Sequence, residues 1–397
     1  MEKLFILSRS KINNVSLTFK RYLLEKVNWK SRLIAIKGAR GTGKTTLLLQ
    51  YARLHLPMDD QTLYVAMDNM FFYENNLYNL ADEFVKLGGK YLLLDGVHKY
   101  SNWSRELKLI YDDFADLKII FTSSSILEIV KAESDFSRRA VDYTLWDLSL
   151  REFIELKSGI KFDTFSLNDI IKNHMEISEG IAKKIKPLAE LQKYYKFGSY
   201  PYYFEDEENY YSKLLATVNL ILDVDLPAIE KLDYAHIAKL EKLLFVISES
   251  VPFTTNVSKL SEKTGISCAA LVRAFGYLEK AHLIIRLMKS GKGNSVLNKP
   301  DKLFMNNSNL LHAISSGNAN TGNVKETFFI NQLKQLHQVS LPEKGDFMIN
   351  ESYIFEIGGK NKTKKQIVNI ENVFIVKDDI ESGIRNTIPL WLFGFLN

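Results

Sequence analysis

Residues 38–45 fit, at every fixed position, the pattern G-x-x-x-x-G-K-[ST] that is typical of a phosphate-binding loop. A short apolar run at residues 33–36 precedes them and predicts a buried strand, and residues 46–52 predict the first turns of a helix. In such a strand–loop–helix, glycines let backbone N–H groups converge on phosphate oxygens, and the amino end of the helix favours negative charge. A chance glycine-rich turn is the alternative, but the pattern and its context agree. The residues predicted to bind the phosphates of a nucleotide are Gly38, Ala39, Arg40, Gly41, Thr42, Gly43, Lys44, Thr45 and Thr46.

The length and composition are those of an ordinary multidomain chain. With 397 residues, about two to four domains are expected. The net charge of +5 is small for this length, so charge alone gives no reason to expect a nucleic-acid partner. Cys268 is the only cysteine, which excludes an intrachain disulfide and a cysteine-based zinc site and suits a reducing cytoplasm. No apolar run approaches the length that spans a membrane, so we expect a cytoplasmic chain with no membrane partner.

Apolar strand-like runs alternate with helical patterns in the first part of the chain. The runs lie at residues 33–36, 63–66, 91–94 and 118–121. Strands separated by helices predict a parallel sheet with helices on both faces. The expected fold class of residues 1–150 is therefore the α/β fold of a P-loop NTPase. Residues up to about 32 are expected to form an N-terminal arm with a helix whose apolar face lies at residues 22–27.

Three further parts are predicted after this sheet. Residues 151–235 have a mostly helical period that is broken by prolines and glycine. Residues 236–307 predict helix, turn, helix and hairpin, which is the order of a winged helix-turn-helix. Residues 308–397 predict a small α/β domain. It begins with a Ser-, Asn- and Gly-rich segment at residues 308–323, which marks a linker or a domain edge, and it ends with a buried strand at residues 389–396.

A carboxylate for magnesium is expected at the end of the third strand, where Asp95 follows an apolar run. In P-loop proteins, the loop hydroxyl, here that of Thr45, and such an aspartate hold Mg²⁺. An aspartate that only starts a turn is the alternative. Gly96 then stands where many ATPases have a glutamate that polarises the attacking water, and glycine cannot do this. The sequence therefore predicts nucleotide binding with hydrolysis that is impaired or catalysed differently. His98 could polarise water, although a histidine on such a loop is more often a surface or packing residue.

Two more polar segments predict residues that sense or stabilise the phosphate. The fourth strand ends in hydroxyls, and Thr122 is the first candidate and Ser124 the second for a sensor of the γ-phosphate. Capping of a following helix by one of these serines is an equally good interpretation. Arg138 and Arg139 lie downstream, where one of them could act as an arginine finger on the transferring phosphoryl group. A charged pair on a solvated surface is the alternative.

Together these motifs resemble the bacterial and archaeal AAA-type ATPases that join a P-loop domain, a winged helix and a C-terminal nuclease-like domain. The resemblance covers nearly the whole chain and is carried by residues 38–45, 92–100, 102–103, 121–125, 138–139, 148–153, 198–201, 302–307 and 355–360. It implies that Lys44 and Thr45 bind phosphate and magnesium and that Asp95 is the magnesium carboxylate. It also implies that Thr122 is the sensor and Arg139 the finger. The family pattern normally has a glutamate at position 96, so Gly96 departs from it.

The C-terminal part resembles a restriction-type nuclease core, which needs an Asp, a Glu and then a Lys two residues after the Glu. The acidic places are fitted by Glu326, Asp346 and Glu356, but Gly358 stands where the lysine is needed. Lys360 and Lys362 are near but out of register. The resemblance therefore implies a degenerate nuclease site whose fold is kept for structure or interaction.

The leading expectation is an ATP- and Mg²⁺-dependent switch or ATPase of the AAA class. The alternative is a DNA-binding module or nuclease that acts through the winged helix and the C-terminal domain, and the winged helix could equally contact a protein. An arginine finger that acts in trans would require a homo-oligomer, whereas monomeric switches of related type need only one chain.

Overall fold

The computed structural model describes residues 1–123, 136, 139–227, 234–249, 253–290, 299–358 and 372–396. These residues form two compact units, Met1–Asp147 and Leu148–Asn397, and each unit is described by itself. The domain bounds expected from the sequence stay predictions. The helical part, the predicted winged helix and the C-terminal domain together make up the second unit.

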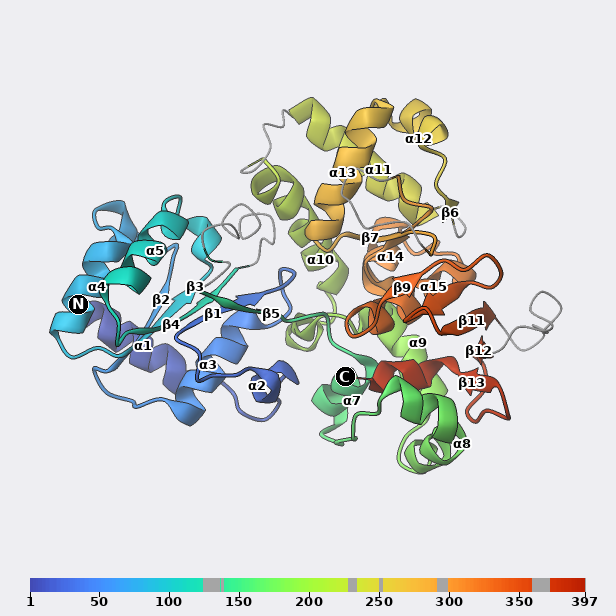
Figure 1. Cartoon of the computed structure of the whole chain (residues 1–397), viewed down its shortest axis with the longest axis horizontal. Coiled ribbons are helices and arrows are strands. Elements are labelled where there is room, and N and C mark those ends of the chain that lie inside the picture. The colour runs from blue at the N-terminus through green and yellow to red at the C-terminus, as the bar shows by residue number, and fades with distance from the viewer. Residues whose placement is uncertain are drawn as a thin grey trace. The chain divides into compact units, whose positions relative to one another are not determined.

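The first unit is built on a parallel sheet (Figure 1). Its described strands run in the order β2-β3-β4-β1-β5. They are β1 (Leu33–Lys37), β2 (Thr62–Ala66), β3 (Tyr91–Asp95), β4 (Lys118–Thr122) and β5 (Val141–Thr144). The four predicted strands are confirmed to within one residue at each end. The edge strand β5 was not predicted, because residues 141–144 carry no apolar run.

Helices cover both faces of this sheet, as the alternation of its side chains requires. In β1, Leu33 and Ala35 belong to one apolar cluster, whereas Ile34 and Ile36 belong to another. The first cluster is closed by α4 (Leu77–Lys86) and α5 (Trp103–Asp113), and the second by α3 (Lys44–His55). Both faces of the strands are therefore buried, which explains their nearly continuous apolar sequence.

The N-terminal arm differs from its prediction. Its main helix is α1 (Glu2–Asn14), whereas α2 (Leu23–Lys26) is a single turn. Leu4 lies in the apolar cluster on one face of the sheet and Ile12 in the cluster on the other. Ser8 Oγ accepts a hydrogen bond of 2.9 Å from the Tyr64 N–H of edge strand β2. Helix α1 thus covers this edge of the sheet and protects it from pairing with other strands.

The second unit begins with helices. The ordered elements are α7 (Leu150–Ser158), α8 (Leu167–Ala182), α9 (Pro187–Phe197), the 3₁₀ turn η3 (Pro201–Glu205), α10 (Tyr210–Leu220) and the π-helical turn η4 (Ile221–Asp225). Helix α7 is capped at its amino end: Ser149 Oγ accepts from the Glu152 N–H, and the Glu152 carboxylate accepts from the Ser149 N–H. This reciprocal capping satisfies two N–H groups that a helix leaves unpaired.

Helices and a small antiparallel sheet follow. They are α11 (Tyr234–Glu249), β6 (Phe253–Thr254), α12 (Val257–Thr264), α13 (Cys268–Lys280), β7 (Ile284–Leu287) and β8 (Lys302–Met305), and the strand order is β6-β8-β7. Gly265 forms the turn between α12 and α13, with a φ of 69°. The assignment of these elements to the winged helices stays a prediction.

The last sheet is mixed. Its elements are α14 (Ser308–Ile314), α15 (Thr321–Lys334), β9 (Val339–Ser340), β10 (Phe347–Ile349), β11 (Tyr353–Gly358), β12 (Val373–Lys377), β13 (Thr387–Pro389) and the 3₁₀ helix η6 (Leu390–Phe395). The predicted terminal strand is wrong in type, since residues 390–395 are buried but helical.

Residues 308–323, predicted to be a linker or a domain edge, are not a plain linker, because α14 occupies their first half. Asn307 caps this helix by accepting from the Leu310 N–H at 2.9 Å. Asn309 is fully buried, and its amide group donates to the carbonyl oxygens of Tyr194 and Tyr195 at 2.9 and 3.1 Å. Its side-chain oxygen accepts from the Ser199 N–H at 2.9 Å. A polar residue with these partners belongs to a core, although in sequence it is typical of a loop.

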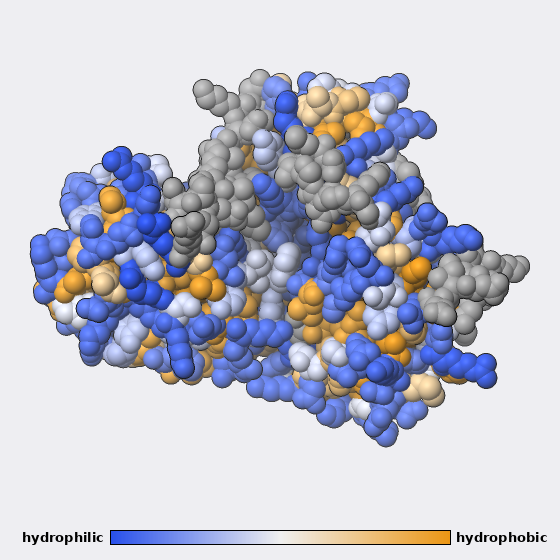
Figure 2. Space-filling view, viewed as in Figure 1, coloured by the Kyte–Doolittle hydropathy of each residue, from blue (hydrophilic) through white to orange (hydrophobic). Residues whose placement is uncertain are grey.

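Hydrophilic side chains cover most of the surface that Figure 2 shows around the first unit, with smaller apolar areas between them. Among the helices of the described residues, we find none that combines the length and the apolar character needed to cross a membrane.

Candidate nucleotide site

The predicted phosphate loop joins the carboxyl end of β1 to the amino end of α3, so the expected strand–loop–helix order is confirmed. Its first residue, Gly38, approaches the chain that follows β5. A Cβ atom at Gly38 would lie 2.2 Å from the carbonyl oxygen of Leu145, so no larger residue fits without moving the backbone. Helix α3 begins at Lys44, and its first N–H groups have no acceptor within the helix. This is the arrangement that binds an anion at a helix amino end.

Lys44 is buried against the loop that it follows. Its Nζ donates to the carbonyl oxygens of Gly38 at 2.9 Å and Ala39 at 2.6 Å. The Thr42 hydroxyl donates to the same Ala39 oxygen at 3.0 Å. The ammonium group is therefore held within the curve of the loop, close to the helix amino end. A lysine in this place can exchange its carbonyl partners for phosphate oxygens.

Arg21 also contacts the phosphate loop, and the sequence did not predict this role. Its buried guanidinium donates to the carbonyl oxygen of Thr42 at 2.5 Å and to that of Trp146 at 2.8 Å. A single side chain thus connects the phosphate loop with the segment after β5. A lone arginine in an N-terminal arm gives no local signal of this role, because its partners lie 21 and 125 residues away.

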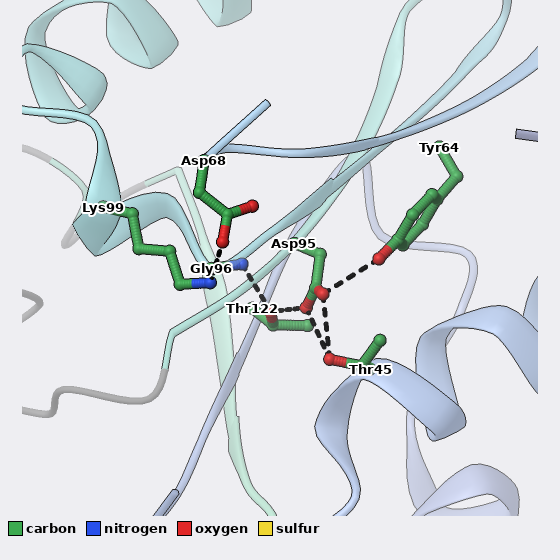
Figure 3. Close-up of polar contacts among 7 residues, drawn as sticks. All are labelled: Thr45, Tyr64, Asp68, Asp95, Gly96, Lys99 and Thr122. Carbon is green, nitrogen blue, oxygen red and sulfur yellow. Dashed lines mark hydrogen bonds and ion pairs between the residues drawn. The ribbon is translucent and has the colours of Figure 1, made fainter. Parts of the chain in front are cut away.

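Asp95 lies at the centre of a cluster of hydroxyl groups at the carboxyl end of the sheet (Figure 3). The Thr45 hydroxyl lies 3.0 Å from Asp95 Oδ1 and 2.8 Å from Oδ2. Thr122 donates to Oδ1 at 2.5 Å, and Tyr64 donates to Oδ2 at 2.9 Å. The predicted residues Thr45, Asp95 and Thr122 are thus brought together.

Tyr64 is the member of this cluster that the sequence analysis did not predict. It lies in the middle of β2, where an apolar run predicts only a core residue. Its side chain is almost completely buried. Burial raises the pKa of its phenol, and the neighbouring Asp95 raises it further. The phenol therefore stays protonated and donates to the carboxylate.

Gly96 is the residue next to this cluster, and its backbone is in the left-handed region, with φ of 72° and ψ of 50°. Its N–H donates to Thr122 Oγ1 at 2.9 Å, so Thr122 connects Asp95 with Gly96. A Cβ atom at this position would lie 3.4 Å from Lys99 Cε. Lys99 in turn forms an ion pair with Asp68, which follows β2. His98 lies 3.3 Å from the Ser123 hydroxyl, measured from Nδ1.

The residues at this edge of the sheet fit a magnesium ion with a nucleoside triphosphate. Mg²⁺ prefers hard oxygen ligands and commonly binds one or two protein oxygens while the phosphates and water complete its shell. The Thr45 hydroxyl and the Asp95 carboxylate supply such oxygens side by side. Thr45 and Thr46 are exposed in the first turn of α3, as is Gly41 in the loop, whereas Lys44 is buried beneath them. A phosphate chain on this surface would meet positive charge, helix N–H groups and the two magnesium ligands together.

Three predicted residues lie away from the phosphate loop or outside the described residues. Arg139 precedes the amino end of β5, whereas the phosphate loop follows the carboxyl end of its parallel neighbour β1. Its guanidinium forms a two-bond pair with Asp112 of α5, at 3.0 and 3.1 Å. Within its own unit, Arg139 is therefore at the opposite end of the sheet from the loop. Ser124 and Arg138 lie outside the described residues.

The predicted acidic residues of the nuclease-like core lie in α15 (Glu326), just before β10 (Asp346) and in β11 (Glu356). Glu326 forms an ion pair with Lys302 at 3.1 Å, and the Asp346 carboxylate accepts from the Ile357 N–H at 2.7 Å. Glu356 is buried in β11. Among the residues that the structure describes, no group of three or more acidic, histidine or cysteine side chains could hold a metal ion. Lys360 and Lys362 lie outside the described residues.

Comparison with known proteins assigns the first unit. Residues 30–154 match the family model of an AAA domain, which spans the sheet and the cluster around Asp95. Residues 30–154 are therefore similar to an AAA-type P-loop domain. A second family model, a domain of unknown function (DUF8612), matches residues 188–321. That match runs from helix α9 to the start of α15 and includes α14, which agrees with the buried position of α14.

Similar proteins include an uncharacterized relative and two solved structures. The uncharacterized protein MJ1637 of Methanocaldococcus jannaschii is 27% identical over 290 residues, which are 70% of this chain and 61% of the relative. The chain thus spans about three fifths of that relative's length. The Walker-type ATPase paby2304 of Pyrococcus abyssi matches with 11% identity over 73% of this chain and 93% of its own, with a TM-score of 0.41. AMPPCP-bound DnaA from Aquifex aeolicus matches with 15% identity over 65% of this chain and 84% of its own, with a TM-score of 0.27. At these scores, neither structure adds to the assignment of the AAA-type domain.

Proposed function

We propose that this chain is an ATP-binding switch of the AAA class, which holds Mg·ATP at the phosphate loop and hydrolyses it slowly. The observation that carries this proposal is the contact of 2.8 Å between the Thr45 hydroxyl and Asp95 Oδ2. A helix residue and a strand-end residue 50 positions apart are held so that one metal ion can bind both. A glycine-rich turn with no nucleotide role would not need this carboxylate.

Each part of the loop has a distinct task in this proposal. Lys44 would bind the β- and γ-phosphates, and the N–H groups at the start of α3 would bind the phosphate oxygens nearest to the helix. Thr45 and Asp95 would hold Mg²⁺, which when bound neutralises charge on the phosphates. Thr122 would respond to the γ-phosphate, because it is already hydrogen-bonded to both Asp95 and the Gly96 N–H. Loss or gain of the ion at Asp95 would thereby change the hydrogen bonds at the end of β4.

Slow hydrolysis follows from Gly96. The residue after the magnesium aspartate has no side chain with which to orient the attacking water or accept its proton. A bound ATP would persist, as a switch requires, and its release or slow cleavage would set the length of the bound state. Arg139 would assist cleavage only in trans, from a second copy of the chain, since it lies at the other end of its own sheet.

A DNA- or protein-binding role of the second unit is the other candidate. It is favoured by the glycine turn that joins α12 to α13, with Lys263 and Arg273 exposed on these helices. This role is compatible with the switch, because the two units carry different sites.

The test is the affinity for a fluorescent ATP analogue in the presence of Mg²⁺. Lys44→Ala is expected to weaken binding by about 10- to 100-fold, the effect of losing charge-assisted hydrogen bonds. Lys86→Ala is the matched control, because it removes a lysine that is 72% exposed on α4 and forms only a surface pair with Asp82. Equal affinity in the wild type and Lys44→Ala would contradict the proposal.

A further inference from the structure

We infer that Asp68, from the neighbouring strand, supplies the carboxylate that Gly96 lacks and orients the water that attacks ATP. This inference rests on the proposed function, and it concerns the slow hydrolysis rather than binding. Asp68 belongs to none of the sequence motifs discussed above. Its position is set by the pairing of β2 with β3.

The backbone brings Asp68 to the side of Gly96. β2 and β3 are parallel, and Ala66 pairs with Asp95. The pairing continues one residue further, because the Met67 N–H donates to the Asp95 carbonyl oxygen at 2.9 Å. The next turn is closed by the Asn69 N–H, which donates to the Ala66 carbonyl oxygen at 3.0 Å. Asp68 is therefore fixed between two hydrogen-bonded residues, at the same sheet edge as Asp95.

The side chain of Asp68 extends toward the space that a residue at position 96 would use. A Cβ atom at Gly96 would lie 3.4 Å from Lys99 Cε and 3.5 Å from Lys99 Cδ. Lys99 Nζ forms the ion pair with the Asp68 carboxylate. Figure 3 shows both side chains beside Gly96, next to the cluster around Asp95. A side chain at position 96 would therefore meet Lys99 first, and Lys99 carries the Asp68 carboxylate.

The two carboxylates at this end of the sheet, Asp95 and Asp68, are suited to different roles. Asp95 is occupied by Thr45, Tyr64 and Thr122, which suits a metal ligand. Asp68 is 54% exposed, so water reaches it, and the hydrogen bond from Lys99 keeps its pKa below the usual value. An ionised carboxylate that water reaches can accept a hydrogen bond from a water molecule, whereas both oxygens of Asp95 already accept hydrogen bonds from side chains.

In the reaction, the water oxygen forms a bond with the γ-phosphorus, and the bond from this phosphorus to the bridging oxygen breaks. The bridging oxygen keeps the electron pair and leaves on ADP. Asp68 accepts the proton that the water loses and passes it to solvent, so that ATP and water give ADP, inorganic phosphate and a proton. Lys99 is a positioning residue in this step, since it holds the carboxylate beside Gly96.

The test separates binding from cleavage in the full chain, with affinity for the ATP analogue and single-turnover hydrolysis of radiolabelled ATP measured on each variant. Asp68→Asn is expected to lower the hydrolysis rate by about 100-fold, a typical contribution of an acid–base residue. Its ATP affinity should stay within about threefold of the wild type, a smaller change than the loss of one hydrogen bond would cause. Asp68→Glu keeps the charge and should retain most of the rate. Asp60→Asn is the control: Asp60 is 62% exposed and also ion-paired, with Arg9, but it precedes β2 at the other end of the strand.

Several results would overturn the inference while the proposed function stands. The first is that Asp68→Asn hydrolyses ATP at the wild-type rate. The second is that the wild type binds ATP but shows no hydrolysis above background. The third is that His98→Gln loses turnover whereas Asp68→Asn does not. Loss of ATP affinity in both Asp68 variants would make Asp68 a structural residue and would overturn it too. Failure of the wild type to bind ATP would instead contradict the proposed function itself.

Discussion

The hydroxyl of Thr45 lies within hydrogen-bond distance of both carboxylate oxygens of Asp95, at 3.0 and 2.8 Å. This contact holds the first turn of α3 against the end of β3. Tyr64 and Thr122 hold the carboxylate from two further strands, so its orientation does not depend on a ligand. Preorganisation of this kind reduces the cost of ordering a metal site when the ion binds.

Gly96→Glu is expected to raise ATP turnover, because it adds a carboxylate beside the site. It should also lower the free energy of unfolding by about 1–2 kcal/mol, the cost of a left-handed backbone in a residue other than glycine. Gly96→Ala is the matched control, since it has the same backbone strain but no carboxylate. Phosphate release and denaturant unfolding measured on both variants check this. Turnover in Gly96→Glu no higher than in Gly96→Ala would mean that Gly96 does not limit hydrolysis.

The ion pairs around Glu279 in the second unit predict a pH dependence of stability. Glu279 Oε2 pairs with Arg286 Nε of β7 and Oε1 with Lys334 Nζ of α15, both at 2.6 Å. Burial acts to raise the pKa of Glu279, but Lys334 and Arg286 outweigh it and hold the pKa below its ordinary value of 4.5. At acid pH the unfolded chain thus binds the proton more readily than the folded one. The stabilisation is full above pH 4.5 and is lost as the pH falls through the folded-state pKa.

Glu279→Gln is expected to remove this dependence and to destabilise the unit by on the order of 2 kcal/mol at neutral pH, because two cations lose their counter-charge. Amide hydrogen exchange in α13 and β7, followed from pH 7 to acid conditions, reads this region separately from the first unit. Equal acid sensitivity of exchange in the wild type and in Glu279→Gln would show that the stabilisation comes from elsewhere.

Local patterns predicted the parts of the fold and site that depend on neighbouring residues. Apolar runs gave four strands to within a residue, and the loop motif predicted the strand–loop–helix and the approach of Thr45 to Asp95. Strand β5 was missed because its residues are half exposed and it carries Asp142, which pairs with Lys37 across the edge of the sheet. This strand is stabilised by its pairing with β1, and the sequence of residues 141–144 alone does not predict that pairing.

Contacts between distant residues account for the remaining differences. Arg21 and Tyr64 reach the site through the tertiary fold, and their own sequence surroundings resemble an arm and a core strand. The sequence of α14 is typical of a linker because it contains Asn309. This asparagine is stabilised in the core by partners that are distant in the sequence. Arg139 was predicted as an arginine finger. Strand direction carries it to the end of its own sheet that lies opposite the phosphate loop, and its role as a finger stays a prediction.

The most direct test of the account is a calorimetric titration of ATP, with Mg²⁺ and with EDTA, into the wild type and into Asp95→Asn. We predict that the wild type binds ATP and that Mg²⁺ tightens this binding by at least about tenfold, or about 1.4 kcal/mol. In Asp95→Asn the effect of Mg²⁺ should fall to a few-fold, because one of the two protein ligands has lost its charge. Absence of ATP binding by the wild type, or an equal effect of Mg²⁺ in both proteins, would contradict the account.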